Sequence, residues 1–273
     1  MKKYIMIFVF GAGLAFNSNA EIVTGEKCGD NCTWTFNTDT KELIISGTGE
    51  MSSFGAIDPE NNGGWRTNAP WGTYADQISK IRVQEGITSL GSYAFYNATA
   101  QSVELPSTLT SLGVTCTFQG ARQLKDINIP QGVTIIPNSI FSATNNLTSI
   151  ILPDSVTTLA SSAFSKDSLC TNPIEIVISD HLTSVDEQAF RNIQNLTIYC
   201  TGDIDVCKTN VGENFADKVK QASKKEINGV TYVYDSKGKL VTTSGSRTEK
   251  RIYTIDEANQ VAGKVNRFRI KYR

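Results

Sequence analysis

The sequence predicts a β-rich solenoid with about six short parallel rungs. Phenylalanine recurs at positions 95, 118, 141, 164 and 190, so the first three intervals are 23 residues long and the fourth is 26. Similar segments end at these phenylalanines, for example residues 87–95, 133–141 and 156–164. A fixed period of this length is typical of coils that stack on one another and bury a common core.

The first 20 residues predict a secretory signal peptide. Residues 1–3 carry two lysines, residues 4–16 are apolar, and Ser18 and Ala20 form a small-x-small cleavage site. An uncleaved anchor is the alternative, but these 13 apolar residues fall short of the roughly 20 that a spanning helix needs. We therefore expect an exported chain beginning at Glu21, either secreted, at the cell surface or in the periplasm, with no transmembrane segment.

Charge is nearly balanced over the chain but unevenly distributed. Without residues 1–20 the chain has 24 basic and 27 acidic residues, a net charge of −3. This balance argues against nucleic-acid binding. Residues 247–273 contain eight Arg or Lys and three acidic residues, a local charge of +5, which leaves −8 for the preceding part. Such asymmetry can mark a docking tail.

Residues 21–76 are expected to form an N-terminal cap. Two β-like runs, 33–36 and 42–46, predict a hairpin. The end of a solenoid exposes its apolar core and needs a cover. We interpret three aromatic residues as packing within this cap, with a sugar-binding aromatic platform as the alternative: Trp65, Trp71 and Tyr74.

Residues 77–207 form the predicted solenoid, in which each coil contributes one short strand. The last apolar residues of these strands, each preceded by another apolar residue two positions earlier, are Val83, Leu105, Ile129, Leu152, Ile178 and Cys200. Proline follows three of the strands and ends the ladder there. The phenylalanines should form a buried column, and the insertion at residues 166–173 should bulge from one edge.

Side chains between the buried positions of each strand should face outward. These outward columns supply the candidate binding residues, which are Lys80, Arg82, Glu104, Asp126, Asn128, Ile151, Glu175, Val177 and Tyr199. The apolar members Ile151, Val177 and Tyr199 have two interpretations. They form a partner-binding stripe, or they reflect the preference of β-branched and aromatic residues for strands.

Six cysteines in an exported chain predict disulfides. Two local pairs are the candidates: Cys28 with Cys32, and Cys200 with Cys207. Whether Cys116 pairs with Cys170 depends on the geometry of coils two repeats apart. No metal site is expected, because a zinc site needs more ligands and His181 is the only histidine.

Residues 208–273 predict a small α+β region that closes the other end. Apolar residues at helical spacing predict a capping helix over 213–225. Runs 230–235 and 240–243 predict a second hairpin. The final residues 267–273 alternate basic and apolar side chains. Their cationic face is either simply solvated or a patch that holds acidic envelope polymers.

The repeat unit resembles a known family. Leu-Thr-Ser-Ile-Ile-Leu-Pro-Asp-Ser-Val-Thr-Thr-Leu-Ala-Ser-Ser-Ala-Phe at 147–164 and the unit at 124–141 resemble the BspA-type leucine-rich repeat, also called LRR_5. Residues 28–36, 43–51 and 69–71 resemble the segment that precedes such repeats. The resemblance covers roughly residues 28–200. It implies a β-rich α/β leucine-rich-repeat solenoid and an exported or surface-displayed bacterial protein, of a kind that often acts in adhesion.

We therefore expect an exported binding protein that recognises a protein or glycan partner outside the cell and uses no cofactor. The alternative is a structural, envelope-associated protein retained by its basic C-terminal segment. Catalysis is not expected, because His181 has only Asp180 beside it and no nucleophile elbow or phosphate loop is present. The sequence specifies neither the partner nor the oligomeric state.

Overall fold

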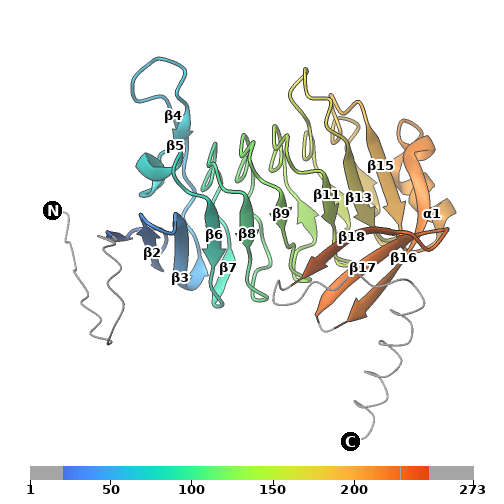
Figure 1. Cartoon of the computed structure of the whole chain (residues 1–273), viewed down its shortest axis with the longest axis horizontal. Coiled ribbons are helices and arrows are strands. Elements are labelled where there is room, and N and C mark those ends of the chain that lie inside the picture. Colours follow the sequence, from blue (N-terminus) through green and yellow to red (C-terminus); the bar gives the residue numbers. More distant parts are fainter. Residues whose placement is uncertain (1–20, 228, 246–273) are drawn as a thin grey trace, which may run out of the picture.

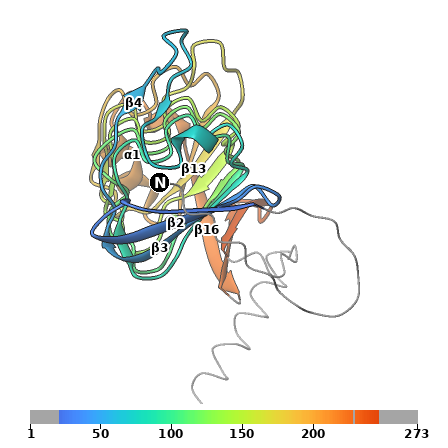
Figure 2. The same ribbon diagram turned by 90° about the vertical axis from the view of Figure 1, so that its left-hand side faces the viewer.

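The structure, a computed structural model, describes residues 21–227 and 229–245. The chain winds in successive coils that stack along one axis (Figure 1). Viewed along that axis, the coils superimpose (Figure 2). Strands of successive coils pair in parallel, so the predicted β-rich solenoid is confirmed.

One strand from each coil contributes to what we call the outer sheet. These strands are β6 (Lys80–Val83), β8 (Ser102–Glu104), β9 (Asp126–Ile127), β11 (Ser149–Ile151), β13 (Ile174–Ile178) and β15 (Leu196–Cys200). The predicted register is confirmed, since Ile81 pairs with Val103, which pairs with Ile127. Between β9 and β11 the described residues form no strand ladder, so the outer sheet has two halves.

A second row of short strands lies on another side of the coils. It contains β7 (Ile87–Ser89), β10 (Ile135–Ile136), β12 (Thr158–Leu159) and β14 (Ser184–Val185). Strands β10, β12 and β14 pair in parallel. Apolar side chains from both rows meet in one continuous core. Each coil therefore buries its apolar side only because neighbouring coils cover it.

The phenylalanine column occupies the centre of this core. Successive ring centroids lie 5.3, 5.9, 5.4 and 6.1 Å apart from Phe95 to Phe190, and the rings are stacked. Trp71 continues the stack beyond Phe95 at 5.8 Å. Phe215 closes the other end, with its ring edge-on to Phe190 at 4.9 Å. The predicted buried column is confirmed, and an aromatic residue from each cap completes it.

The N-terminal cap contains β1 (Ile22–Glu26), β2 (Asn31–Asn37) and β3 (Glu42–Glu50). The predicted hairpin is confirmed, because β2 and β3 pair antiparallel. Strand β3 also pairs in parallel with β6 and so begins the outer sheet. Beyond β3 lie β4 (Ala56–Ile57), β5 (Arg66–Thr67) and the 3-10 turn η1 (Gly72–Tyr74).

The three aromatic residues of this cap do not behave alike. Trp71 is fully buried, and its Nε1 donates to the main-chain oxygen of Ala94 at 2.8 Å. The Tyr74 ring packs on Phe36, with centroids 5.0 Å apart. Trp65 is 51% exposed, so the expectation that it packs within the cap is wrong. It lies just before β5, at the end of the loop that projects above the coils in Figure 1.

The predicted helix over 213–225 is wrong. The helix is α1 (Ile204–Val211), followed by the 3-10 turn η2 (Ala216–Lys218) and strand β16 (Val219–Ile227). Asp203 caps the helix, because its Oδ1 accepts from the amides of Asp205 at 2.9 Å and Val206 at 3.2 Å. Strand β16 forms because the edge of β15 has backbone groups that need hydrogen-bonding partners. Within the described residues, no helix is long and apolar enough to span a membrane.

The predicted second hairpin is confirmed as β17 (Val230–Asp235) and β18 (Leu240–Gly245). It turns back across the outer sheet, as Figure 1 shows at its lower right. There Ser149 Oγ lies 3.0 Å from Thr242 Oγ1, and Lys224 forms an ion pair with Asp154. The basic segment 247–273, with its expected strand at 267–273, lies outside the described residues.

Candidate functional site

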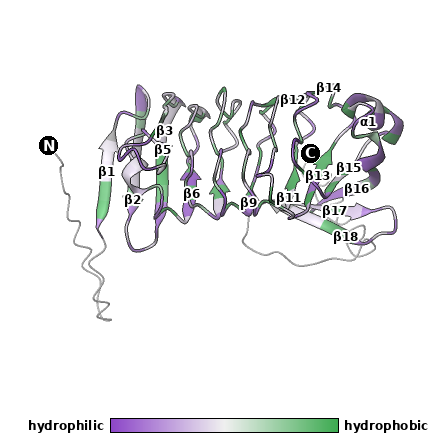
Figure 3. Cartoon of the chain, turned by 90° about the horizontal axis from the view of Figure 1, so that it is seen from above, coloured by the Kyte–Doolittle hydropathy of each residue, from purple (hydrophilic) through white to green (hydrophobic). Residues whose placement is uncertain are grey.

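The outer sheet is the candidate binding surface, and its first half is open and charged. Lys80 and Arg82 project from β6, and their side chains are 30% and 43% exposed. Lys80 Nζ lies 2.7 Å from Glu104 Oε1, and Arg82 Nε lies 3.0 Å from Glu104 Oε2. The hydrophilic colour of β6 in Figure 3 follows from these residues. The structure thus brings together three of the predicted site residues.

Glu42 is a member of this array that sequence reasoning missed. Its Oε1 lies 3.1 Å from Arg82 Nη2 and 3.6 Å from Lys80 Nζ. Glu42 pairs in register with Lys80 because β3 joins the outer sheet in parallel. The signal was the apolar run 43–45, which follows the same pattern as the later rungs. We call Glu42, Lys80, Arg82 and Glu104 the charged array.

The pKa of Glu104 reflects its place in this array. Partial burial opposes ionisation, but the hydrogen bond and positive charge of Lys80, together with Arg82, outweigh it and hold the pKa below its ordinary value. The carboxylate therefore stays ionised at neutral pH. Lys80, Arg82 and Glu104 are between 30% and 45% exposed, so the ion pairs between them contribute little to stability. The Glu42 oxygen that faces Lys80 and Arg82 is itself buried.

Asn128 and Asp126 lie in the third coil, beside the charged array. Asn128 uses its amide to extend the pairing between coils, because Oδ1 accepts from the Leu105 amide at 3.0 Å and Nδ2 donates to the Leu105 oxygen at 3.1 Å. Asp126 pairs in register with Ser102 and is half-buried. The Asn128 side chain thus links two neighbouring coils, in addition to lying on the predicted surface.

The apolar half of the predicted surface is covered by the chain itself. Val177 is 1% exposed, and Tyr199 is also buried. Both pack with Ile151 against residues of the C-terminal strands, which are Ala222, Val233 and Val241. The expectation that Ile151, Val177 and Tyr199 face outward to a partner is therefore wrong, because the β16–β18 sheet occupies that face.

Glu175 lies at the margin of this covered region. Burial is the main cause that raises the pKa of its carboxyl, and the charges of Lys220 and Lys239 only partly oppose it. Its side chain also hydrogen-bonds Tyr199. Glu175 therefore belongs to the contact between the outer sheet and the C-terminal strands, and its predicted role in partner binding stays a prediction.

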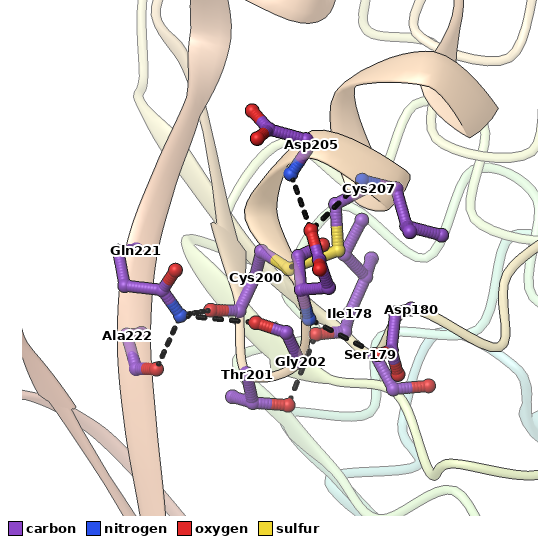
Figure 4. The surroundings of a disulfide bond; sticks show 12 residues. Ile178, Ser179, Asp180, Cys200, Thr201, Gly202, Asp205, Cys207, Gln221 and Ala222 are labelled. Atoms are coloured by element: carbon purple, nitrogen blue, oxygen red, sulfur yellow. Dashed lines mark hydrogen bonds between the residues drawn. A yellow bond between two sulfur atoms is a disulfide. The ribbon is translucent and has the colours of Figure 1, made fainter.

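Both predicted disulfides are present. Cys28, in the turn before β2, pairs with Cys32 at the start of β2, and Cys200 pairs with Cys207. The second joins the end of β15 to α1, as Figure 4 shows. There Gln221 Nε2 on β16 also donates to the main-chain oxygens of Cys200 and Gly202, both at 3.1 Å.

The remaining cysteines and the single histidine lie apart from one another. Cys116 is buried and Cys170 is half-buried, and both are free thiols. His181 Nδ1 lies 3.1 Å from the main-chain oxygen of Asp154. The neighbouring Asp180 accepts the Asp203 amide at 3.0 Å, so its carboxylate is engaged with a different segment. Among the described residues, no three His, Cys, Asp or Glu side chains gather as metal ligands would.

The insertion at residues 166–173 bulges from one edge, as predicted. With Asn145, it lines a shallow hollow of about 450 Å³. Leu169 at its tip is 92% exposed. Asp167 anchors the loop, because its Oδ2 accepts from Asn145 Nδ2 at 2.7 Å and from Arg122 Nε at 3.2 Å.

Comparisons with known proteins point to one repeat family. A family model for the BspA-type leucine-rich-repeat region matches in six copies, at residues 73–197 and 168–205. None of the curated proteins matched the chain.

Several solved structures are similar in fold. A leucine-rich-repeat protein from Eubacterium ventriosum is 19% identical, with 66% of this chain and 73% of that chain covered and a TM-score of 0.33. The T. pallidum leucine-rich-repeat protein is 18% identical, with 62% and 82% covered and a TM-score of 0.40. A leucine-rich cell surface protein from Faecalibacterium prausnitzii is 18% identical, with 80% and 60% covered and a TM-score of 0.40.

Proposed function

The repeat region of this chain, residues 73–205, belongs to the BspA-type leucine-rich-repeat family, and from this premise we propose that the protein is an exported binding protein. It recognises a macromolecular partner outside the cell through the open half of its outer sheet. The observation that carries this proposal is the charged array, which remains accessible while the chain's own C-terminal strands cover the other half.

The charged array suits recognition better than stability. Exposed ion pairs contribute between about 0 and 1 kcal/mol each, so the fold gains little from placing four charges on adjacent strands. A rigid sheet holds these charges at fixed spacing, with neighbouring strands about 4.8 Å apart. Fixed charges of both signs select a partner of complementary pattern and accelerate its association. The partner that fits this surface best is a protein with charged side chains of matching arrangement.

A location outside the cytoplasm is supported by two independent features. Residues 1–20 have the composition of a signal peptide. The disulfides Cys28–Cys32 and Cys200–Cys207 suit an oxidising compartment, because the cytosol keeps thiols reduced. Secretion, display on the cell surface and the periplasm all satisfy both features.

Reversing one charge of the array should weaken partner binding. The mature protein is used to isolate its partner from host-matrix and envelope extracts, and affinity is then measured with the purified partner. We expect Arg82→Glu to weaken binding on the order of tenfold, since it places a third carboxylate beside Glu42 and Glu104. Arg122→Glu is the matched control, because Arg122 is also an ion-paired, partly exposed arginine but lies away from the array. Equal affinity of both variants would show that the charged array does not bind the partner.

Removing residues 247–273 separates the binding function from the structural alternative. We expect the shortened protein to remain cell-associated to the same extent as the full chain, because the proposed surface lies at residues 42–104. The measurement is the fraction of protein in the medium compared with that on washed cells. A large release of the shortened protein would instead support retention through the +5 segment.

A further inference from the structure

The loop between β4 and β5 and the turns of the first two coils carry aromatic and apolar residues at one corner, outside the outer-sheet strands that hold the charged array. Trp65 is 51% exposed and Val114 is 77% exposed. Tyr93 and Tyr96 are half-buried, and their ring centroids lie 5.5 Å apart. We call Trp65, Tyr93, Tyr96, Asn97 and Val114 the corner patch. Clustered apolar side chains on a surface indicate interaction sites more strongly than scattered ones.

Two departures from the regular repeat create this patch. The loop between β4 and β5 ends at Trp65. The second repeat has one extra residue before its phenylalanine, since Leu112 lies six positions before Phe118 and Leu90 lies five positions before Phe95. Val114 lies in this longer turn, where its amide donates to Ser92 Oγ at 3.4 Å. Both irregular segments thus meet the turn that carries the two tyrosines.

Hydrogen bonds hold the loop and the corner together. Asn97 Nδ2 donates to the main-chain oxygen of Trp65 at 2.7 Å, which places Trp65 beside the tyrosine turn. Within the loop, Asp58 Oδ2 accepts the Gly63 amide at 2.7 Å. At the other side of the turn, the Tyr93 amide donates to the Thr115 oxygen at 3.3 Å. The patch is therefore preorganised on fixed backbone, which lowers the entropic cost of binding.

Gly120 is adapted to the position of Asn97. A Cβ atom at residue 120 would lie 1.7 Å from Asn97 Oδ1, and the glycine has φ of +73°. Only glycine accepts both conditions without strain. The absence of a side chain at Gly120 thus leaves room in the next coil for the Asn97 amide that binds the Trp65 main chain.

The turns of the corner patch are aromatic and uncharged, and the charges nearest in sequence are those of the Trp65 loop, namely Asp58, Glu60 and Arg66. Residues 86–121, which carry the tyrosine turn and the longer turn of Val114, contain no Asp, Lys, Arg or His and a single Glu, Glu104 on β8. Their partly exposed polar groups are hydroxyls and amides, including the half-buried Gln119 side chain. The Tyr93 hydroxyl hydrogen-bonds Cys116, and this contact is the main cause that raises the pKa of Tyr93. The phenol therefore remains a neutral hydrogen-bonding group.

We propose that the corner patch binds a neutral oligosaccharide. The faces of aromatic rings are negative and attract the positively polarised C–H groups of a sugar ring. Amide and hydroxyl groups donate to and accept from sugar hydroxyls. Trp and Tyr supply large contact areas at low cost in side-chain entropy. A protein partner is a poorer fit, because stable protein interfaces bury about 800 Å² per partner around an apolar centre, whereas here a few rings alternate with polar groups.

Tryptophan fluorescence tests this proposal directly. The chain has three tryptophans, and Trp34 and Trp71 are buried, so acrylamide should quench Trp65 selectively. The probes are maltohexaose, cellohexaose and mannohexaose, with an acidic hexagalacturonate for comparison. We expect at least one neutral probe to protect Trp65 from acrylamide at millimolar concentration or below, and hexagalacturonate to give no protection.

Variants separate a binding role from a structural one. Calorimetric titration of Tyr96→Ala and Trp65→Ala should show binding weakened at least tenfold, which corresponds to about 1.4 kcal/mol. Leu169→Ala, at another highly exposed apolar residue, should bind like the wild type. Thermal unfolding controls for the fold of each variant. Arg82→Glu should retain sugar binding, so failure of this proposal and failure of the charged array are distinguishable.

Three outcomes would overturn the proposal. The neutral probes could all fail to protect Trp65, or Trp65→Ala could bind them as the wild type does. Protection of Trp65 by a purified protein partner, with none from the sugars, would assign the corner patch to protein binding instead.

Discussion

Replacing Phe141 by alanine should lower the free energy of unfolding by about 3–5 kcal/mol. Phe141 is fully buried, and its ring lies 5.9 Å from that of Phe118 and 5.4 Å from that of Phe164. The neighbouring coils are held in register by their strands, so they cannot collapse into the space left by the ring. The cost therefore contains both the lost burial and the residual cavity. Equilibrium unfolding in guanidinium chloride measures it.

Ile135→Ala is the matched control for this substitution. Ile135 lies in the same coil as Phe141 but is 51% exposed, so we expect a loss of at most about 0.5 kcal/mol. A similar loss for both variants would contradict a core centred on the phenylalanine column. Solenoid repeats contribute nearest-neighbour terms to stability, so Phe118→Ala, with equivalent neighbours, should resemble Phe141→Ala.

The phenylalanine column and the strand register were predictable because each coil buries apolar residues at equivalent positions of its repeat. Ile81, Val103 and Ile127 occupy equivalent positions at nearly constant spacing, and the structure pairs them directly. A single short apolar run fits either a strand or a buried helix segment. Because the same run recurs in every repeat, the strand assignment could be checked at several positions. The disulfides Cys28–Cys32 and Cys200–Cys207 were predictable for a related reason, since each closes a short local loop.

The covered half of the outer sheet was not predictable from local patterns. Val177 and Tyr199 stood out as apolar residues in an outward column, and the two interpretations were a partner or strand preference. Their cover comes from Val233 and Val241, after the chain has left the solenoid. The contacts that fix this cover join Ser149 to Thr242 and Asp154 to Lys224, and no repeat signals such separations.

The error at residues 213–225 has a different cause. Phe215, Val219 and Ala222 have helical spacing, but their segment lies next to the unpaired edge of β15. Forming strand β16 satisfies the backbone groups of that edge, which outweighs a weak local preference for helix. In the same way, β3 pairs with the edge strand β6 and satisfies its backbone groups, and this pairing puts Glu42 beside Lys80 in the charged array.

Lys166 carries the other large expected effect, because its ammonium group is buried in the insertion. The side chain is 4% exposed, and Nζ donates to the main-chain oxygens of Thr144 at 2.5 Å and Leu147 at 3.1 Å. Burial lowers the pKa of this lysine to about 8, although the charges of Cys170 and Asp167 oppose the shift. The folded protein therefore releases the proton at a lower pH than the unfolded chain does.

The sign of the pH dependence follows from proton linkage. Between about pH 8 and the ordinary lysine pKa of 10.5, the unfolded chain binds a proton at Lys166 that the folded protein has released. Stability rises with pH wherever the unfolded state binds more protons. A gap of this size corresponds to about 3 kcal/mol, gained as pH rises through that window. Below pH 8 both states hold the proton, and the cost of the buried charge is present in full.

We therefore compare the free energies of unfolding of the wild type and Lys166→Met from pH 6 to pH 10.5. The methionine keeps much of the side-chain volume but does not titrate. The wild type should gain stability relative to this variant by about 3 kcal/mol over the upper part of the range. Below about pH 7 the difference should stay constant, which serves as an internal control. A difference that stays constant up to pH 10.5 would mean that water reaches the Lys166 amine in the folded protein, and that the insertion is not packed on the solenoid around Thr144 and Leu147.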